Sequence, residues 1–292
     1  MIKMKNKNLN INRRNFLELV SGMTLLPSLV LSEERKFNPK SKGWAIQYPS
    51  SKQKVRGFIG IPNVWGEQLK SPQKYYKRAN IGLVEAIKKY TDINAYSDAH
   101  LFLSSNKLIE YPFLYIATDK QFELTKTEID NFENYLKNGG FAVLESLRSS
   151  TQENIWYSFE DDYSAEASLK QMMKDVLKKD ARFLPIPNSH KLYHCFFDFN
   201  DGPPQGIEVD LVRIGTWNGS AGVDWQHITF PKPRPYLEGI FLDDRLAVVY
   251  SGKGYGRKWE DIANNEPQQK MGVNFVVYAL TQKDGIAQKN KY

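Results

Sequence analysis

The sequence predicts an α/β fold: a mostly parallel sheet with helices on its faces, plus an added β-hairpin region. Two short apolar runs, residues 113–117 and 141–144, have the pattern of strands that are buried on both faces. A capped amphipathic helix separates them, which makes a strand–helix–strand unit. Residues 238–242 and 246–250 alternate around a turn at 243–244, as expected for a hairpin.

The helix between the two buried runs carries its own start and stop signals. Thr125 is an N-cap residue and Glu128 follows three positions later, which is the spacing of a capping box. The Asn-Gly-Gly segment at 138–140 supplies residues that tolerate the left-handed backbone of a helix end. The apolar side chains between these signals fall on one helical face: Ile129, Phe132, Tyr135 and Leu136.

The remaining elements follow from shorter patterns along the chain. Apolar residues at helical spacing predict helices over 75–90, 165–177 and 271–280. Apolar or β-branched runs predict strands over 43–48, 55–61 and 207–214, and a short strand or extended link over 96–103. Polar or Gly- and Pro-rich composition predicts loops over 145–163 and 215–236, with the tip of a hairpin as the alternative for the second.

The first 32 residues resemble a twin-arginine export signal. Arg13 and Arg14 follow a Lys-rich start, and an apolar run at 19–31 comes after them. This run has 13 residues, whereas a membrane-spanning helix needs about 20. We therefore expect a periplasmic or other extracytoplasmic protein that touches the membrane only if the signal stays uncleaved.

The predicted organisation is a signal segment at 1–32, a linker at 33–42, one α/β domain at 43–281 and a polar tail at 282–292. The formal net charge is +7, of which residues 1–32 contribute +4, so that 7 − 4 = +3 remains for the rest. Such a nearly balanced domain lacks the basic footprint of a nucleic-acid-binding protein. The chain has one cysteine, which excludes an intramolecular disulfide and a multi-thiolate metal site.

Motifs from residue 43 to 281 resemble the family called domain of unknown function 4159. The resemblance implies a fold similar to class I glutamine amidotransferases, a flavodoxin-like three-layer sandwich, and it assigns no reaction. The motifs that carry it are Tyr111-Pro112-Phe113-Leu114-Tyr115, Leu124-Thr125 with Glu128, Tyr135-Leu136, Gly139-Gly140-Phe141, Ser189-His190-Lys191-Leu192-Tyr193-His194, Phe197-Asp198, Gly202-Pro203-Pro204, Leu237-Glu238-Gly239-Ile240, Arg245-Leu246-Ala247-Val248-Val249-Tyr250-Ser251 and Gly272-Val273-Asn274.

An amidotransferase needs a cysteine nucleophile at a tight turn after a strand. The turn that follows residues 141–144 begins with Glu145 and reaches Arg148 without a cysteine or a G-x-S-x-G elbow. Cys195 lies in an apolar segment, which is typical of a buried structural thiol. The sequence therefore argues against glutaminase activity and leans away from an enzyme.

Glu145 is the first candidate site residue. A carboxylate at the carboxyl end of a central parallel strand lies where such folds bind ligands. Alternatively, Glu145 pairs with Arg148 or with a helix N-terminus.

His190, His194 and Asp198 form the second candidate group. Their i, i+4 spacing would put them on one face of a helix, where they could bind Zn²⁺. The aromatic pattern that follows is closer to a strand, so no metal is predicted and the three residues remain a weak candidate. Otherwise, one histidine fixes the loop, or His190 lines the crevice as a base or ligand donor.

Residues 252–260 are rich in glycine and basic residues but match no phosphate-binding motif, and we expect a flexible loop at the rim of the crevice. Trp259 in this segment could stack on a ligand or plug the edge of the core.

Two functional hypotheses follow. The first is an exported, non-catalytic domain that binds a small polar or saccharide ligand, or an envelope partner, through Glu145, Arg148, His190 and loop aromatic residues. The alternative is a cell-envelope or extracellular hydrolase that uses Glu145 and His190. No cofactor is predicted.

Overall fold

A computed structural model gives the arrangement of the chain, which divides into two units, Met1–Lys36 and Phe37–Tyr292. The structure describes residues 41–69, 78–146, 164–207, 212–217, 223–228, 234–260 and 265–289, all in the second unit. The predicted export signal and Arg148 lie outside the described residues, as do the predicted linker before residue 41 and most of the 145–163 loop.

The strands are β1 (Gly43–Tyr48), β2 (Ser51–Trp65), β3 (Asp92–Phe102), β4 (Phe113–Thr118), β5 (Phe141–Ser146), β6 (Leu184–Pro185), β7 (Val212–Trp217), β8 (Val223–Ile228), β9 (Glu238–Leu242) and β10 (Arg245–Ser251). The α-helices are α2 (Ala79–Tyr90), α3 (Lys126–Lys137), α4 (Ser164–Leu177), α5 (Tyr255–Glu260), α6 (Glu266–Thr281) and α7 (Ile286–Lys289). Short 3₁₀ helices are η1 (Asn106–Glu110), η2 (Lys178–Asp180) and η3 (Lys191–Tyr193).

The α/β fold is confirmed, but its sheets are mixed rather than mostly parallel. The five-stranded sheet has the order β4-β5-β10-β9-β6, in which β4, β5 and β10 are parallel and the β9 pairings are antiparallel. The second sheet, β1-β2-β3, pairs β1 with β2 antiparallel and β2 with β3 parallel. Tight turns account for two of the antiparallel pairs, because β1 joins β2 and β9 joins β10 through two residues.

The predicted hairpin is confirmed as β9 and β10. Asp243 and Asp244 at its turn have φ values of 47° and 64°, and two left-handed residues match the right-handed twist of the flanking strands. A further hairpin pairs β7 with β8 in a two-stranded sheet.

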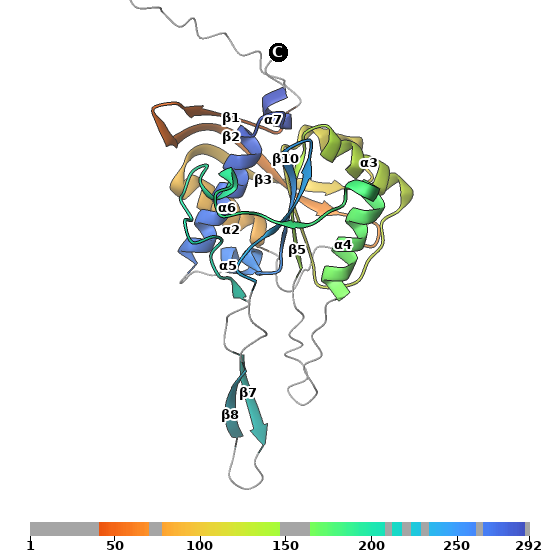
Figure 1. Cartoon of the computed structure of the whole chain (residues 1–292), viewed down its shortest axis with the longest axis vertical. Coiled ribbons are helices and arrows are strands. Elements are labelled where there is room, and N and C mark those ends of the chain that lie inside the picture. The colour runs from red at the N-terminus through yellow and green to blue at the C-terminus, as the bar shows by residue number, and fades with distance from the viewer. Residues whose placement is uncertain are drawn as a thin grey trace, which may run out of the picture. The chain divides into compact units, whose positions relative to one another are not determined.

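Helices cover both faces of the central strands. In Figure 1, α2, α5 and α6 lie on one side of β5 and β10, and α3 and α4 lie on the other. Every residue of β4 and β5 is buried, as predicted for strands between two helical layers. Successive side chains point into different cores: Phe113, Tyr115, Phe141 and Val143 join one cluster, while Leu114, Ile116, Ala142 and Leu144 join the other.

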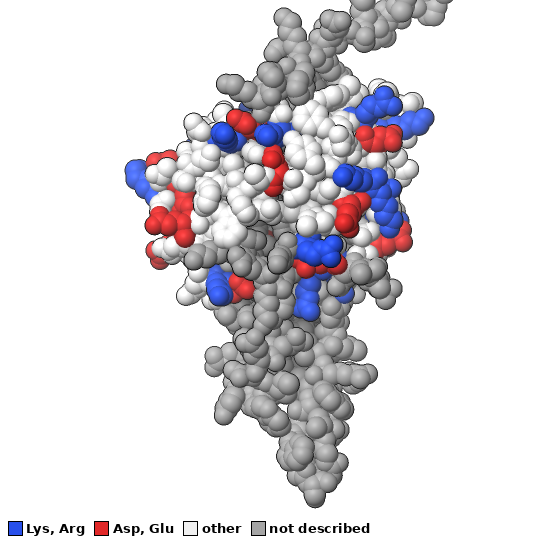
Figure 2. Space-filling view, turned by 180° about the vertical axis from the view of Figure 1, so that it is seen from behind, with Lys and Arg blue, Asp and Glu red and all other residues white. Residues whose placement is uncertain are grey.

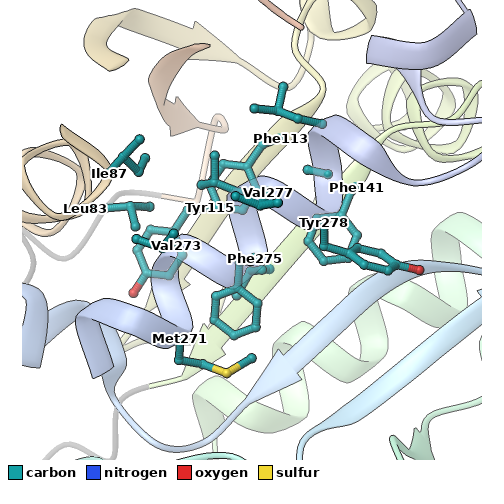
Figure 3. Packing of buried hydrophobic residues seen from close by; sticks show 14 of the residues in the cluster. Leu83, Ile87, Phe113, Tyr115, Phe141, Met271, Val273, Phe275, Val277 and Tyr278 are labelled. Carbon is teal, nitrogen blue, oxygen red and sulfur yellow. The ribbon is translucent and has the colours of Figure 1, made fainter. Parts of the chain in front are cut away.

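The larger of these cores is built mainly by α6. Figure 3 shows Phe275 and Val277 of this helix among the aromatic side chains of β4 and β5. Leu83 of α2 contributes from the neighbouring helix, and all of these side chains are buried. A helix that is buried almost all round, as α6 is, belongs to the interior of the domain.

The predicted capping box at the start of α3 is confirmed. Thr125 Oγ1 accepts a hydrogen bond from the Glu128 backbone N–H, and a Glu128 carboxylate oxygen accepts one from the Thr125 N–H at 2.8 Å. The other Glu128 oxygen accepts the Glu67 N–H at 2.7 Å. Glu128 therefore fixes both the helix start and the segment after β2. Gly139, with φ +100°, ends the same helix in a conformation that favours glycine.

The structure corrects four boundaries. Strand β2 continues through Pro62, because the register shift between Ile61 and Asn63 is an irregularity that accommodates a residue without an N–H. The first strand after the 202–204 turn is β7, which begins at Val212 rather than at 207.

The segment 252–260 is not a loop throughout, since α5 begins at Tyr255. The predicted polar tail contains α7, whose Ile286 is buried and donates its N–H to the Gly139 carbonyl. None of the helices in the described part of the chain is long and apolar enough to cross a membrane.

The capping box predicts the effect of removing its hydroxyl. Thr125→Ala should lower the free energy of unfolding by about 1 kcal/mol, because the Glu128 N–H loses its acceptor. Urea denaturation of the variant and the wild type measures the difference. Thr127→Ala, two residues further on the exposed side of the same helix, is the control and should change stability by less than about 0.5 kcal/mol. Equal losses in both variants would contradict a specific role for the cap.

Candidate functional site

Glu145 lies at the carboxyl end of β5, next to Ser251 of β10 and Ala117 of β4. Its side chain is fully buried. The two carboxylate oxygens accept four hydrogen bonds: from Tyr115 Oη at 2.6 Å, and from Ser251 Oγ, the Tyr255 N–H and the Gly256 N–H at 2.8 Å each. The carboxylate therefore joins three parallel strands to the first turn of α5.

A glycine turn makes this contact possible. Gly254 has φ +68°, and a Cβ at this position would lie 2.4 Å from Ile207 Cγ1. Only glycine fits such a backbone without strain. The turn directs the first N–H groups of α5 toward Glu145, and a carboxylate at a helix N-terminus is electrostatically favourable. The helix-N-terminus interpretation of Glu145 matches this geometry.

The environment of Glu145 acts on its ionisation in two directions. Burial raises the pKa of the Glu145 carboxyl above its ordinary value, and the four donors work against that rise. All four contacts are with donors, so the ionised form satisfies every one of them. Both oxygens of the Glu145 carboxylate thus have their hydrogen-bond partners within the protein.

A charged quartet lies on the β9 and β10 side of this edge. Lys170 Nζ lies 2.8 Å from Glu166 and 3.0 Å from Glu238, and Arg234 lies 3.0 and 2.9 Å from the same two carboxylates. Burial acts to raise the pKa of Glu166, but the contacts with Lys170 and Arg234 lower it overall. Each charge in the quartet is paired.

The hydroxyl of Ser146, the residue after Glu145, also has a partner inside the protein. Ser146 Oγ lies 2.8 Å from Tyr250 Oη, and both side chains are buried. The hydroxyl at the end of β5 is therefore part of an internal hydrogen bond.

His190 lies away from Glu145. Its Nδ1 accepts the Leu192 N–H at 3.1 Å, which caps η3, and its ring contacts those of Phe241 and Tyr278. Burial lowers the pKa of the His190 imidazole. Tyr278 in turn packs against Phe141 at the start of β5, whereas Glu145 lies four residues further along the same strand, a rise of about 13 Å. Among the described residues no hydrogen bond joins His190 to Glu145, whose partners are Tyr115, Ser251, Tyr255 and Gly256.

His194 and Asp198 form a surface contact instead of a metal site. His194 Nδ1 lies 3.1 Å from Asp198 and Nε2 lies 2.8 Å from the Asn188 carbonyl, while Lys52 pairs with Asp198 at 2.5 Å. The three residues do not share a helical face, because only the single turn η3 forms here. Across the described ranges, no three His, Cys, Asp or Glu side chains are grouped to hold a metal.

Two further predicted roles are settled by burial. Cys195 is buried and its thiol contacts the Asn274 carbonyl at 3.3 Å, and burial raises the pKa of the Cys195 thiol to about 12. The prediction of a structural thiol is confirmed. Trp259 is 2% exposed and donates Nε1–H to the Gln268 carbonyl at 2.8 Å. Of the two roles expected for Trp259, its burial matches the filling of the core, because α5 turns the indole inward.

A cavity of about 520 Å³ lies at the opposite edge of the sheet, beside the amino end of β10. Charged side chains of both signs surround two apolar residues. The lining residues are Lys137, Asp180, Phe241, Leu242, Asp243, Arg245, Asp284 and Lys289. We call this cavity the β9–β10 pocket.

Sequence reasoning assigned Asp243 to a turn and gave no role to Arg245 or Asp284. The lining comes from α3, η2, the β9–β10 turn and the segment around α7, which are far apart in sequence. The one local signal was the Asp-Asp dipeptide, and it indicates a turn rather than a pocket.

Surface charge in the described part of the chain is mixed. Figure 2 shows acidic and basic side chains interspersed on the face it presents, without a basic stripe among the coloured residues. This distribution agrees with the nearly balanced charge of the domain.

The Glu145 network predicts a structural effect of substitution. Glu145→Gln should lower the free energy of unfolding by about 1–3 kcal/mol, because an amide N–H₂ would then face buried donors. Urea denaturation at pH 7 measures this loss. Glu123→Gln, an exposed carboxylate, is the control and should stay within about 0.5 kcal/mol of the wild type. Unchanged stability in Glu145→Gln would show that the carboxylate is not required for folding.

The charged quartet predicts a pH dependence. The pKa of Glu166 is lowered in the folded protein, so its contribution is present above its unfolded pKa and is lost as pH falls through the lower folded pKa. Glu166→Gln should remove about 0.5–1 kcal/mol at neutral pH and flatten the stability profile below about pH 4.5. Denaturation series from pH 7 to 3 measure the profile. Glu85→Gln, at an exposed position of α2, should leave it unchanged, and the same flattening there would contradict this assignment.

Comparison with known proteins places the chain in a family. No curated protein matches it. The family described as "Domain of unknown function (DUF4159)" matches residues 68–280, well over half of the chain. This span includes β3 to β10, the Glu145 network and most of the β9–β10 pocket lining. The resemblance seen in the sequence motifs is therefore confirmed, and the chain belongs to the family described as domain of unknown function DUF4159.

Proposed function

We propose that this protein is an exported, non-catalytic binding domain for a small polar or saccharide ligand, or for an envelope partner. It makes no use of nucleic acid. The proposal includes an amidotransferase-like, flavodoxin-like origin of the fold, supported by the parallel strands β4, β5 and β10 with helices on both faces.

The observation that carries the non-catalytic proposal is the state of Glu145. Its carboxylate is fully buried and accepts four hydrogen bonds from the protein itself. A general acid or base must reach its substrate directly or through one water. Ser146, beside Glu145, is held by Tyr250, and the single cysteine of the chain, Cys195, is buried against the Asn274 carbonyl.

The β9–β10 pocket supports a binding role. Its volume of about 520 Å³ lies in the range of small-molecule sites, roughly 300–1,000 Å³. Its wall combines two apolar residues, Phe241 and Leu242, with six charged residues, so it offers both apolar surface and charge to a polar ligand. The candidate binding residues thus move from the Glu145 edge to the opposite edge of the sheet.

Export is supported by the amino-terminal sequence. Arg13 and Arg14 precede Phe16-Leu17 and a 13-residue apolar run at 19–31, in the order of a twin-arginine signal. A periplasmic or other extracytoplasmic location follows, where polar solutes and envelope components are the available ligands.

A thermal-shift screen tests the proposal. The full-length protein is heated with divalent metals, EDTA, mono- and disaccharides, amino acids and cell-wall fragments. A ligand that binds only the folded state raises the melting temperature by mass action. At a free ligand concentration of 100 times Kd, the free energy of unfolding increases by about 2.7 kcal/mol. We expect such a rise with a polar small molecule. Turnover of an amide or glycosidic substrate by the wild-type protein would contradict the non-catalytic proposal.

A further inference from the structure

Arg245 is the most deeply placed cation of the β9–β10 pocket. Its guanidinium donates hydrogen bonds to the Gly140 carbonyl at 2.8 Å and to the Leu136 carbonyl, both at the end of α3. These carbonyls carry partial negative charge at a helix C-terminus. An arginine has five N–H donors, so the two hydrogen bonds fix the plane of the group and leave donors for another partner.

No carboxylate pairs with Arg245 in the described residues. Burial lowers the pKa of the Arg245 guanidinium, while Asp284 and Asp243 act on it from a distance to raise it. A half-buried cation with only carbonyl partners is costly unless an anion completes it. A guanidinium held in a fixed plane is suited to a carboxylate, which it binds through two parallel hydrogen bonds.

The pocket also contains carboxylates, Asp243 and Asp284, that form no ion pair among the described residues. Lys289 on α7 is another lining cation without an ion pair there, whereas Lys137 is paired with Glu133 at 2.6 Å. The pocket therefore presents cationic and anionic groups that do not form ion pairs with one another among the described residues.

The backbone around this pocket is held in an unusual conformation. Among the described residues, the non-glycine positions with positive φ are Lys178, Asp243, Asp244 and Asp284. Two of these line the pocket, and the other two adjoin lining segments. At Asp243 and Asp244 this conformation is that of the β9–β10 hairpin turn. Asp243 and Asp284 are exposed and line the same cavity as Arg245.

Phe241 and Leu242 form the apolar part of the lining. The Phe241 ring also contacts the His190 ring, with ring centroids 5.7 Å apart. His190 therefore packs against one residue of the pocket lining without being part of that lining itself.

We propose that the β9–β10 pocket binds a small zwitterion, an amino acid with an apolar side chain, whose carboxylate lies on Arg245 and whose ammonium lies between Asp243 and Asp284. The side chain contacts Phe241 and Leu242. This inference rests on the proposed binding function and names its ligand class. A simple anion leaves the aspartates of the pocket unmatched, and a neutral sugar leaves both the aspartates and Arg245 unmatched.

The test uses probes that differ in one charge. Calorimetric titration of the full-length protein is carried out with L-leucine, with L-leucinamide, which lacks the carboxylate, and with N-acetyl-L-leucine, which lacks the ammonium. L-leucine should bind at least tenfold more tightly than either analogue, because each analogue loses one of the two charge contacts. A disaccharide serves as the neutral probe and should bind no better than the analogues.

A pair of variants in one turn separates binding from folding. Asp243→Asn removes a pocket charge, whereas Asp244→Asn changes the neighbouring residue, which is not part of the lining. Both positions have positive φ, and asparagine tolerates this conformation. Asp243→Asn and Asp284→Asn should weaken L-leucine binding at least tenfold, and Asp244→Asn should leave it unchanged. These variants keep the Arg245 contacts with α3, so they test the pocket without removing that helix cap.

Each other outcome overturns a defined part of the proposal. Equal binding of L-leucine and N-acetyl-L-leucine, or equal losses in Asp243→Asn and Asp244→Asn, would exclude a zwitterion in this pocket. A sugar that binds and is lost in Asp243→Asn would overturn the ligand class but keep the binding function. Failure of all of these probes, together with an empty thermal-shift screen, would overturn both.

Discussion

The fold depends on one interaction, the seating of the Glu145 carboxylate on the first turn of α5. A buried carboxylate is tolerated only when its oxygens are matched by donors, and here the donors come from β4, β10 and the start of a helix. The group therefore sets where β5 ends, how the chain turns at 252–254 and where α5 begins. Trp259 on that helix then fills the core between α5 and α6.

This constraint has a consequence for function. Folds with a parallel sheet usually bind ligands at the carboxyl ends of the strands. In this protein the central position at that edge is taken by an internal capping contact, and Ser146 beside it is taken by Tyr250. The described cavity lies instead at the amino end of β10, where the chain brings together a helix end, a hairpin turn and the segment before α7.

The two edges of the sheet treat a buried charge differently. Glu145 at one edge has all of its partners within the protein, whereas Arg245 at the other has two helix carbonyls and no carboxylate in the described ranges. Satisfied buried polar networks fix a structure, and incompletely matched ones mark places where another molecule can contribute. That contrast, more than the presence of any single residue type, directs attention to the β9–β10 pocket.

The sequence by itself determined the parts of this protein that rest on short-range physics. The capping box at Thr125 and Glu128, the two buried strands on either side of α3, the β9–β10 hairpin and the structural role of Cys195 all follow from neighbouring residues and their periodicity.

Only the tertiary structure decided the partners of Glu145, the burial of Trp259, the separation of His190 from Glu145 and the lining of the pocket. In each case the contacting residues lie far apart along the chain, as Glu145 does from Ser251 and Tyr255. A pattern of neighbouring residues cannot predict contacts between segments so distant in sequence. The continuation of β2 through Pro62 was likewise decided by strand pairing. The irregularity between Ile61 and Asn63 leaves Pro62 without a paired position, so its missing N–H costs no ladder hydrogen bond.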